Sequence, residues 1–418
     1  MAMIDKLLKQ MVTEHASDLH MSTGQQIRMR LHGDLVPISE KVVEQKTLET
    51  IMKEITREDQ WKSFDETSEL DFSYGIEGVS RFRCNYFKHA RGYGAVYRII
   101  PEKILTLEEL NLPRAMYNLL TFKSGLILVT GPTGSGKSTT LAAIINELNE
   151  HQNKMIVTVE DPVEFVHPNK RSHIFQREVG ADTPGFYEAL RDALHQDPDV
   201  ILVGEMRDLE TISLALKAAE MGVLVFGTLH TNSAPKTIDR IIDVFPSQQQ
   251  EQVRSMLAES LKAIASQQLL RTQDEKSRVC AVELMVEGPG LANLIRDGAI
   301  SKLYSYMQTH RSLGMQIMDE AIMHYVLDHV VSPTEGYRKA NDKKAVQAFY
   351  DENDIPFDVD EAFKTTVTAP EKKQKIVVDQ HSQQQGQTSG RSNGQLQNGQ
   401  ESEQEPQTPT IRRSRRRE

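Results

Sequence analysis

The stretch from Gly125 to Thr140 constrains this chain more than any other part of its sequence. Four apolar residues, Leu126 to Val129, lead into a loop with the spacing Gly-x-x-x-x-Gly-Lys-Ser, and a helical pattern begins directly after it. A strand, a glycine-rich loop and a helix in this order form a P-loop, which binds the phosphates of a nucleotide. The alternative is a glycine-rich turn without a ligand, and the flanking strand and helix argue against it.

The residue types in this loop match what a triphosphate requires. Backbone N–H groups must point at the phosphates, and glycines keep side chains out of their way. Lys137 supplies a positive charge for the β- and γ-phosphates, while the Ser138 hydroxyl can ligate Mg²⁺. We therefore predict that the chain binds ATP with Mg²⁺ through the residues Gly131, Thr133, Gly134, Ser135, Gly136, Lys137, Ser138 and Thr139.

The composition argues against several classes of protein. The formal charge of -10 gives no general reason to expect nucleic-acid binding. The two cysteines, Cys84 and Cys280, form no CxxC pair, so neither a disulfide framework nor a structural zinc site is expected. The N-terminus lacks an apolar run of signal-peptide length, and no later run could span a bilayer. We predict a cytoplasmic protein without membrane insertion.

The chain divides into four predicted parts. Residues 1–100 read as a small α+β domain of short alternating segments, with a helical stretch from Lys46 to about Phe64. Residues 101–123 read as a linker with a helix that starts at Thr106. Residues 124–350 are predicted to form an ATPase domain that ends in helices. Residues 351–418 become rich in Gln and Ser and end in a basic cluster, which predicts a largely disordered tail.

Strands and helices alternate through the predicted ATPase domain. Apolar segments are expected to form strands at 126–129, 155–159, 200–203 and 223–226. Past Gln248 the pattern predicts mostly helix, with one more strand at 278–284. Strands that alternate with helices indicate a parallel sheet covered on both faces, in which ligands bind beyond the carboxyl ends of the strands.

Polar residues follow three of these strands at that edge. Glu160-Asp-Pro-Val-Glu164 follows the second strand, and position alone does not rank Glu160, Asp161 and Glu164 as the general base. Glu205 follows the third strand and is predicted to hold the metal, whereas Asp199 precedes that strand and would lie at the wrong end of the sheet. His230 follows the fourth strand as a polarising or sensing residue.

Two arginines of the first domain are further candidates. Arg83 lies in an alternating strand, with Phe82 and Cys84 on its other face, and Arg98 lies in the next strand. Both could belong to a solvated strand face. They could equally act as arginine fingers that reach the phosphates of a nucleotide held on another domain.

Four boxes in order resemble the secretion ATPase superfamily, and more narrowly the type IV pilus retraction ATPases of the PilT/PilU family. The matching segments are similar to the Walker A, Asp, Walker B and His boxes and cover residues 131–138, 160–167, 197–208 and 227–231. The resemblance implies a PAS-like N-terminal domain and a RecA-like P-loop ATPase domain. It also implies a homo-hexameric ring that binds an inner-membrane platform protein at the cytoplasmic face and disassembles the pilus.

The same resemblance assigns roles to individual residues. It implies that Glu164 is the catalytic base, that Glu205 is the Walker B acid, and that His230 takes part in coupling. It further implies that Arg83 and Arg98 approach the phosphates.

One segment departs from the family's pattern. The retraction signature Ala-Ile-Arg-Asn-Leu-Ile-Arg-Glu reads Gly290-Leu-Ala-Asn-Leu-Ile-Arg-Asp297 here, with Ala292 in place of the first arginine. The longer C-terminal extension resembles the accessory PilU-type paralogue, which would make a paralogous retraction ATPase a partner. The alternatives of an accessory module and of a pilus assembly or type II secretion ATPase stay open, while a nucleic-acid translocase is disfavoured by the charge.

Overall fold

A computed structural model describes residues 2–31, 33–100 and 103–359 of the chain. The described residues all belong to one compact unit. The described part of the tail ends at Val359, so most of the tail that we predict to be disordered lies outside the described residues. Among the described residues, no helix combines the length and the apolar composition that a membrane crossing requires.

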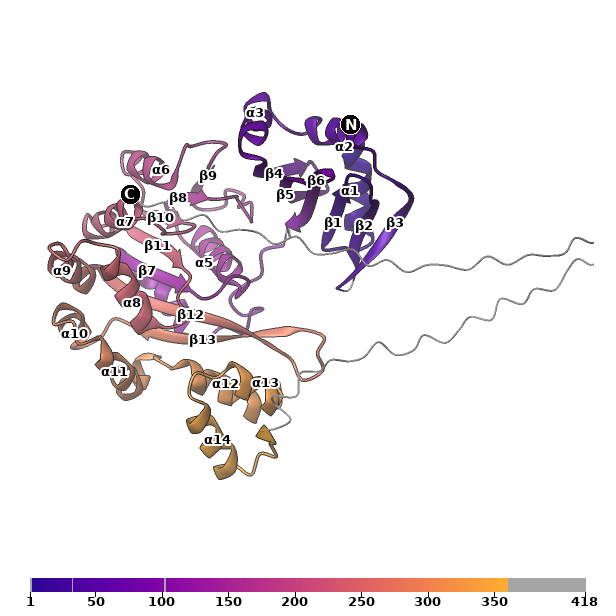
Figure 1. Cartoon of the computed structure of the whole chain (residues 1–418). Coiled ribbons are helices and arrows are strands. Elements are labelled where there is room, and N and C mark those ends of the chain that lie inside the picture. Colours follow the sequence, from indigo (N-terminus) through magenta and orange to yellow (C-terminus); the bar gives the residue numbers. More distant parts are fainter. Residues whose placement is uncertain (1, 32, 101–102, 360–418) are drawn as a thin grey trace, which may run out of the picture. The chain divides into compact units, whose positions relative to one another are not determined.

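The first hundred residues form a six-stranded antiparallel sheet with the strand order β3-β2-β1-β6-β5-β4 (Figure 1). Side chains of α1, α2, α3 and the sheet share one hydrophobic core. The elements are α1 (Met3–Thr13), β1 (Asp18–Ser22), β2 (Gln26–Leu31), β3 (Asp34–Val42), α2 (Gln45–Lys53), α3 (Glu58–Thr67), β4 (Glu69–Ile76), β5 (Ser80–His89) and β6 (Gly92–Ile100). An α+β unit is therefore confirmed here, while its PAS-like character stays a prediction.

Alternation along β5 explains how this sheet builds its core. Phe82, Cys84 and Tyr86 are fully buried on one face, as the sequence predicts, and the residues between them are more exposed. Tyr86 packs edge-on against Phe72 of β4 at a ring-centroid distance of 5.1 Å. The arginines of β5 therefore lie on the opposite face of the strand, away from this core.

The helical stretch predicted from Lys46 to about Phe64 is two helices instead of one. The backbone N–H of Arg57, directly before α3, donates to the Gln60 side chain at 3.1 Å, an interaction typical of a new helix N-terminus. The chain between α2 and α3 thus starts a second helix with its own cap, which periodicity alone did not reveal.

The second sheet has seven strands in the order β13-β12-β7-β11-β10-β8-β9. Every residue of β7 and β11 is buried, so the central strands are covered on both faces. Its strands and the helices between them are β7 (Gly125–Thr130), α5 (Lys137–His151), β8 (Met155–Glu160), β9 (His173–Glu178), α6 (Phe186–Ala193), β10 (Val200–Val203), α7 (Leu209–Glu220), β11 (Leu224–Leu229), α8 (Ala234–Asp243), α9 (Gln250–Ser260), β12 (Leu261–Arg271) and β13 (Arg278–Val286).

The prediction for this sheet needs two corrections. Strands β9 and β12 are absent from the predicted set, and residues 261–271 were expected to be helical. In addition, β13 runs antiparallel to β12, so the sheet is mixed at that edge. Buried Ser266 and Gln267 disguise β12 in the sequence, because their polar groups bond Thr130 and Thr140 at 2.8 Å instead of facing water.

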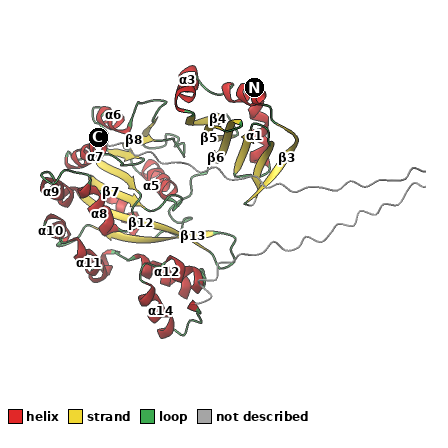
Figure 2. Cartoon of the chain, in the orientation of Figure 1, coloured by secondary structure: helices red, strands yellow, loops and turns green. Residues whose placement is uncertain are grey.

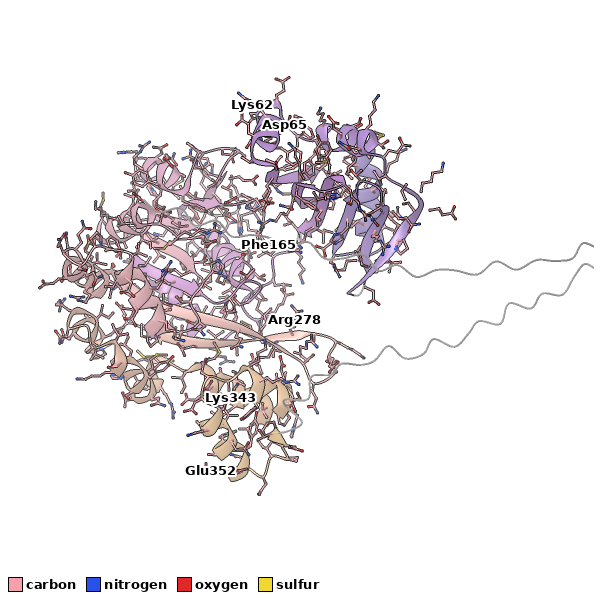
Figure 3. The ribbon with its side chains drawn as sticks, viewed as in Figure 1. Lys62, Asp65, Phe165, Arg278, Lys343 and Glu352 are labelled. Carbon is pink, nitrogen blue, oxygen red and sulfur yellow. The ribbon has the colours of Figure 1, made fainter. Side chains whose placement is uncertain are left out.

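The chain after β13 is helical (Figure 2). Residues of α12 to α14, among them Ile322 and Tyr350, share a second, small core with Leu270 of β12 and Ala281 of β13. The elements here are α10 (Leu291–Arg296), η2 (Ile300–Lys302), α11 (Leu303–Thr309), η3 (Arg311–Leu313), α12 (Met318–Leu327), α13 (Pro333–Lys339) and α14 (Lys343–Glu352). The first and last residues of α14 are labelled in Figure 3. The linker before the second sheet contains α4 (Ala115–Asn118) and η1 (Leu119–Thr121).

The predicted start of the tail at residue 351 is too early. Helix α14 continues to Glu352, and the Phe357 ring lies 5.2 Å from the Tyr350 ring and 4.7 Å from the Tyr337 ring. These aromatic contacts hold the chain against the C-terminal helices for several residues past the predicted boundary.

Candidate nucleotide site

The glycine-rich loop has the predicted strand–loop–helix context. It follows β7 and leads into α5, whose N-cap is Gly136 with φ of 91°. Gly131 adopts φ of +146°, and a Cβ there would lie 2.4 Å from the backbone oxygen of Gln267. A side chain at Gly131 is therefore excluded both by the conformation and by the neighbouring strand β12.

Polar groups of the loop are held ready for a ligand. The buried Ser135 hydroxyl has no hydrogen-bond partner among the described residues. Lys137 Nζ donates to the backbone oxygens of Gly131 at 2.9 Å and Pro132 at 3.3 Å. Burial lowers the pKa of Lys137, although Glu205 and Glu164 act to raise it. The lysine therefore lies within the field of both predicted acids.

One cavity of about 310 Å³ brings most of the predicted site together. It lies beside α5 and beyond the carboxyl ends of β8, β10 and β11, as the strand-end rule predicts. The predicted residues among those that line it are Arg83, Thr133, Gly134, Lys137, Ser138, Glu160, Asp161, Glu164, Glu205 and His230. Gly131, Ser135, Gly136 and Thr139 belong to the loop but do not line this cavity.

Glu205 is the most engaged acid of the cavity. Arg207 Nη2 donates to Glu205 Oε2 at 2.5 Å, and Arg207 Nε lies 2.5 Å from Oε1 as an ion pair. His230 Nε2 lies 3.0 Å from Glu205 Oε1. Burial acts to raise the pKa of Glu205, but the hydrogen bond and charge of Arg207 hold that pKa below its usual value. Asp199, in contrast, accepts from the Met155 N–H at the start of β8, which confirms that it lies at the other end of the sheet.

The three acids after β8 differ in their surroundings. Glu160 is held by Thr158 at 2.7 Å and by Gln176 at 3.2 Å, and burial raises its pKa. Burial likewise raises the pKa of Asp161, with the charge of Asp71 as the next cause. The Glu164 carboxylate accepts no hydrogen bond from any other described side chain, while it lines the cavity with Lys137. Asp161 also lines the cavity without such a hydrogen bond, so both Asp161 and Glu164 are free to bind a water molecule.

The two predicted arginines occupy different environments, although their Cα atoms are partners across β5 and β6. Arg83 lines the cavity and donates to Asp71 at 2.5, 3.1 and 3.2 Å, a hydrogen bond that raises its pKa. Arg98 does not line the cavity, because Asp18 of β1 is its cross-strand neighbour and accepts from its Nε at 2.8 Å. Within this chain, the structure therefore separates Arg98 from the other predicted site residues.

Two groups of residues near the site were not predicted from the sequence. Gln176 and Glu178 of β9 hold the loop that follows β8. A further cavity of about 300 Å³ shares Thr133 and Gly134 with the first and is lined by Leu269, Arg271 and Arg278 among others. Of the six residues of β9 only the adjacent Ile174 and Phe175 are apolar, so no alternation marks this strand, and nothing local pointed to β12.

Comparison with known proteins agrees with this architecture. Residues 1–356 match the family model described as type II/IV secretion system protein. The chain is 49% identical over 337 residues to the type IV pilus retraction ATPase PilT of Pseudomonas aeruginosa, which covers 81% of this chain and 98% of that protein. It is 39% identical over 319 residues to the type IV pilus ATPase PilU of the same organism, covering 76% of this chain and 83% of PilU.

A solved structure supports the same relationship. The crystal structure of the pilus retraction motor PilT with bound ADP superposes with a TM-score of 0.77 at 40% sequence identity. The match covers 83% of this chain and 99% of that one, and so includes both sheets. The chain therefore belongs to the type II/IV secretion system protein family and, within it, to the PilT/PilU group of pilus retraction ATPases.

Proposed function

We propose that this protein is an ATP-hydrolysing motor that powers type IV pilus retraction. One observation supports the proposal above the others: a single cavity is lined by the P-loop lysine, by Glu164 and Glu205, and by Arg83 of the N-terminal sheet. These groups supply a phosphate-binding cation, a water-binding acid, a metal-binding acid and a second cation. Phosphoryl transfer to water requires this set because its catalysis consists of positioning and charge stabilisation.

Each residue has a role that follows from its surroundings. Lys137 binds the β- and γ-phosphates, and its position on the loop carbonyls keeps it at the mouth of the cavity. Glu164 orients the attacking water and accepts its proton: its carboxylate is not engaged by other side chains, and the resemblance to the family favours it over Asp161, which is equally free. His230 contacts Glu205 and so connects the strand end of β11 to that of β10.

The residues present also fit a magnesium ion. Ser138 and Glu205 line the same cavity, and the lowered pKa of Glu205 keeps its carboxylate ionised at neutral pH. Mg²⁺ commonly takes one or two protein oxygens and completes its shell with phosphate oxygens and water. Ser138 and Glu205 would hold the ion, which supplies charge neutralisation between the β- and γ-phosphates.

We place the nucleotide base in the further cavity beside the loop. The half-buried Leu269 offers an apolar surface, and its Cδ2 lies 3.9 Å from the position of a Cβ on Gly136. Arg271 and Arg278 are directly opposed on β12 and β13, and neither side chain forms an ion pair among the described residues. Guanidinium groups stack on aromatic rings and donate hydrogen bonds, so these two side chains suit an aromatic base.

The proposal extends to assembly. Arg83 lies on the N-terminal sheet, so it can act as an arginine finger only where that sheet closes on a bound nucleotide. Arg98, bound to Asp18 in its own chain, would act only after that pair opens. We propose a homo-hexameric ring at the cytoplasmic face of the inner membrane, bound to the pilus platform protein, without nucleic acid as a partner.

The function is tested in cells and in solution together. A strain that lacks the gene is complemented with the wild-type gene or with Lys137→Ala and scored for surface pili and twitching. We expect Lys137→Ala cells to be heavily piliated but non-motile, and the purified variant to hydrolyse no ATP. A deletion strain without surface pili would instead identify an assembly or export motor.

A specific observation favours an accessory motor as the second candidate. Ala292 replaces an arginine of the retraction signature, and this residue lines a cavity of about 390 Å³ with Leu291 and Ile295 of α10. An accessory retraction paralogue would bind nucleotide but turn it over slowly by itself. Purified protein with micromolar nucleotide affinity and negligible turnover, activated by a paralogous retraction ATPase, would support this second function.

A further inference from the structure

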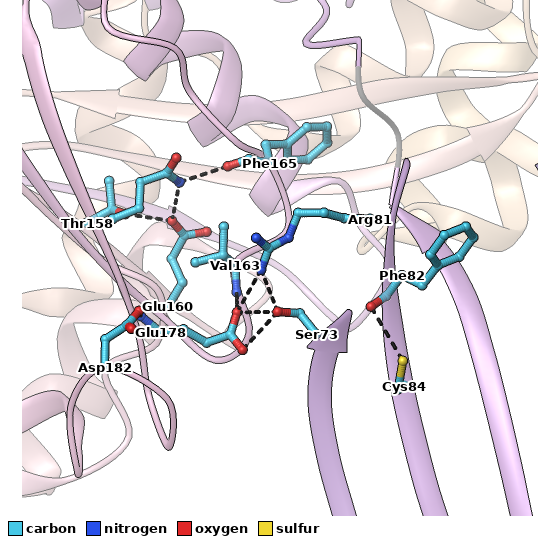
Figure 4. Close-up of polar contacts among 11 residues, drawn as sticks. Ser73, Arg81, Phe82, Cys84, Thr158, Glu160, Val163, Phe165, Glu178 and Asp182 are labelled. Atoms are coloured by element: carbon cyan, nitrogen blue, oxygen red, sulfur yellow. Dashed lines mark hydrogen bonds and ion pairs between the residues drawn. The ribbon is translucent and has the colours of Figure 1, made fainter. Parts of the chain in front are cut away.

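Strand β9 supports the loop that carries Glu164 at two points. Gln176 accepts from the His167 N–H at 2.7 Å and donates to the Phe165 oxygen at 2.8 Å, on the far side of Glu164. Glu178 accepts from the Val163 N–H at 3.2 Å, on the near side (Figure 4). The backbone on both sides of Glu164 is therefore fixed by alternate side chains of one strand.

Glu178 also contacts the N-terminal sheet. Ser73 of β4 donates to its two oxygens at 2.7 and 2.9 Å, and Arg81 of β5 donates to Oε2 at 3.2 Å (Figure 4). Arg81 additionally donates to Ser73 at 2.5 Å, so the two residues approach Glu178 as one unit. Only 7% of Glu178 is exposed, and its carboxylate oxygens are occupied by the N-terminal sheet and by the loop that follows β8.

Because the Glu178 carboxylate is buried, the loss of one of its partners affects its contacts with the others. A buried carboxylate is tolerated when it is paired and hydrogen-bonded, and it becomes unfavourable when one partner leaves. A displacement of Ser73 and Arg81 leaves Glu178 with the Val163 N–H and without a counter-charge. The carboxylate must then turn toward water, which releases Val163 directly beside Glu164.

We propose that Glu178 is a positioning residue for ATP hydrolysis, through which Ser73 and Arg81 of the N-terminal sheet hold the loop of the catalytic base in place. This inference rests on the proposed function, because it gives Glu178 a purpose only if Glu164 acts on water. Glu178 lies outside the cavity and touches neither nucleotide-binding loop nor Glu164 itself. Its effect therefore passes through the backbone of Val163.

The test compares three variants of the full chain with one matched control. Glu178→Gln removes the charge at the junction, while Ser73→Ala and Arg81→Met remove its two partners on the N-terminal sheet. Asp182→Asn is the control, because Asp182 accepts from the Glu178 N–H in the same turn without contacting Val163 or Ser73. ATP turnover is measured as kcat and KM separately, together with nucleotide binding and the melting temperature.

We expect Glu178→Gln to lower kcat about tenfold, the size of effect that follows from loss of a hydrogen bond to a charged group. Nucleotide affinity and KM should stay within about twofold, because the P-loop contacts are unchanged. Ser73→Ala and Arg81→Met should lower kcat in the same direction. Their combination with Glu178→Gln should cost no more than Glu178→Gln alone, since all three act through one junction.

The outcomes separate this inference from the proposed function. If Lys137→Ala leaves the turnover intact, the proposed function fails and this inference fails with it. If wild-type protein hydrolyses ATP and Glu178→Gln has the same kcat as Asp182→Asn, only the inference is overturned. Additive losses in the double variants would likewise overturn it, while a changed melting temperature at unchanged kcat would reduce Glu178 to a structural role.

Discussion

The ion pair between Asp71 and Arg83 leads to the prediction that removal of the Asp71 charge raises the rate of ATP hydrolysis. Asp71 lies opposite the strand of Arg83 and binds its guanidinium through both carboxylate oxygens, with distances of 2.5 to 3.2 Å. An arginine finger must leave such a partner before it can stabilise charge on a phosphate. If Arg83 is the arginine finger that we propose, Asp71 competes with the transition state for the same guanidinium group.

The free energy of the Arg83–Asp71 interaction depends on how exposed the two side chains are. Hydrogen bonds to charged groups contribute about 1.5–3 kcal/mol when they are buried. The Arg83 and Asp71 side chains are 39% and 35% exposed, so solvent screening reduces the pair to about 1 kcal/mol. If Asp71→Asn removes that cost from the barrier, kcat should rise about three- to fivefold. The KM for ATP should change little, because Arg83 is not part of the P-loop.

Steady-state ATP hydrolysis by the purified full chain measures this effect. Asp65→Asn is the matched control, because it removes an acid that pairs with Lys88 in the same sheet at 3.4 Å and lies outside the cavity. Arg83→Ala should slow turnover with ATP binding nearly intact. A kcat for Asp71→Asn at or below the wild-type value would refute the competition and would show that Asp71 positions Arg83 for catalysis.

Three further predictions follow from single sites. Glu164→Gln should lower kcat by about a hundredfold or more with nucleotide affinity retained, as single-turnover assays would reveal. Gly131→Ala should abolish nucleotide binding in a titration with labelled ATP, because its Cβ would meet the Gln267 oxygen at 2.4 Å. Burial raises the pKa of Glu283 to about 7 from 4.5, so its contribution to folding is complete below pH 4.5 and is lost as pH rises through 7. The urea concentration at the midpoint of unfolding should therefore decrease as the pH is raised from 5 to 8. This decrease should be smaller in the Glu283→Gln variant.

The parts of the site that could be predicted are those whose geometry is local. The loop from Gly131 to Ser138 encodes its own conformation through its glycines and its flanking strand and helix. Glu205 and His230 could be placed because the ends of parallel strands meet at one edge whatever the rest of the chain does. These residues indeed line one cavity with Lys137.

The parts that could not be predicted depend on partners far along the chain. Ser73 and Glu178 are 105 residues apart, and no periodicity connects them. Arg98 and Arg83 look equivalent in the sequence, yet Asp18 faces only Arg98 across its strand pair. Strand β12 was hidden because its buried polar side chains find partners on β7 and α5, a compensation that is visible only in the folded chain.

The two arginines on the outward face of β5 connect the inference on Glu178 with the prediction on Asp71. Arg81 and Arg83 are two residues apart on one face of one strand, so a single displacement of β5 moves both. Arg81 is bound by Glu178 of β9, whereas Arg83 is bound by Asp71 of its own sheet. Arg83 therefore moves together with Asp71. It would leave Asp71 only for another negative charge, such as one bound in the cavity. Arg81 in turn connects β5 to β9 through its ion pair with Glu178. The double variant Asp71→Asn with Arg81→Met should accordingly lose the gain of Asp71→Asn alone, because a freed Arg83 without the Glu178 junction is no longer held beside the nucleotide.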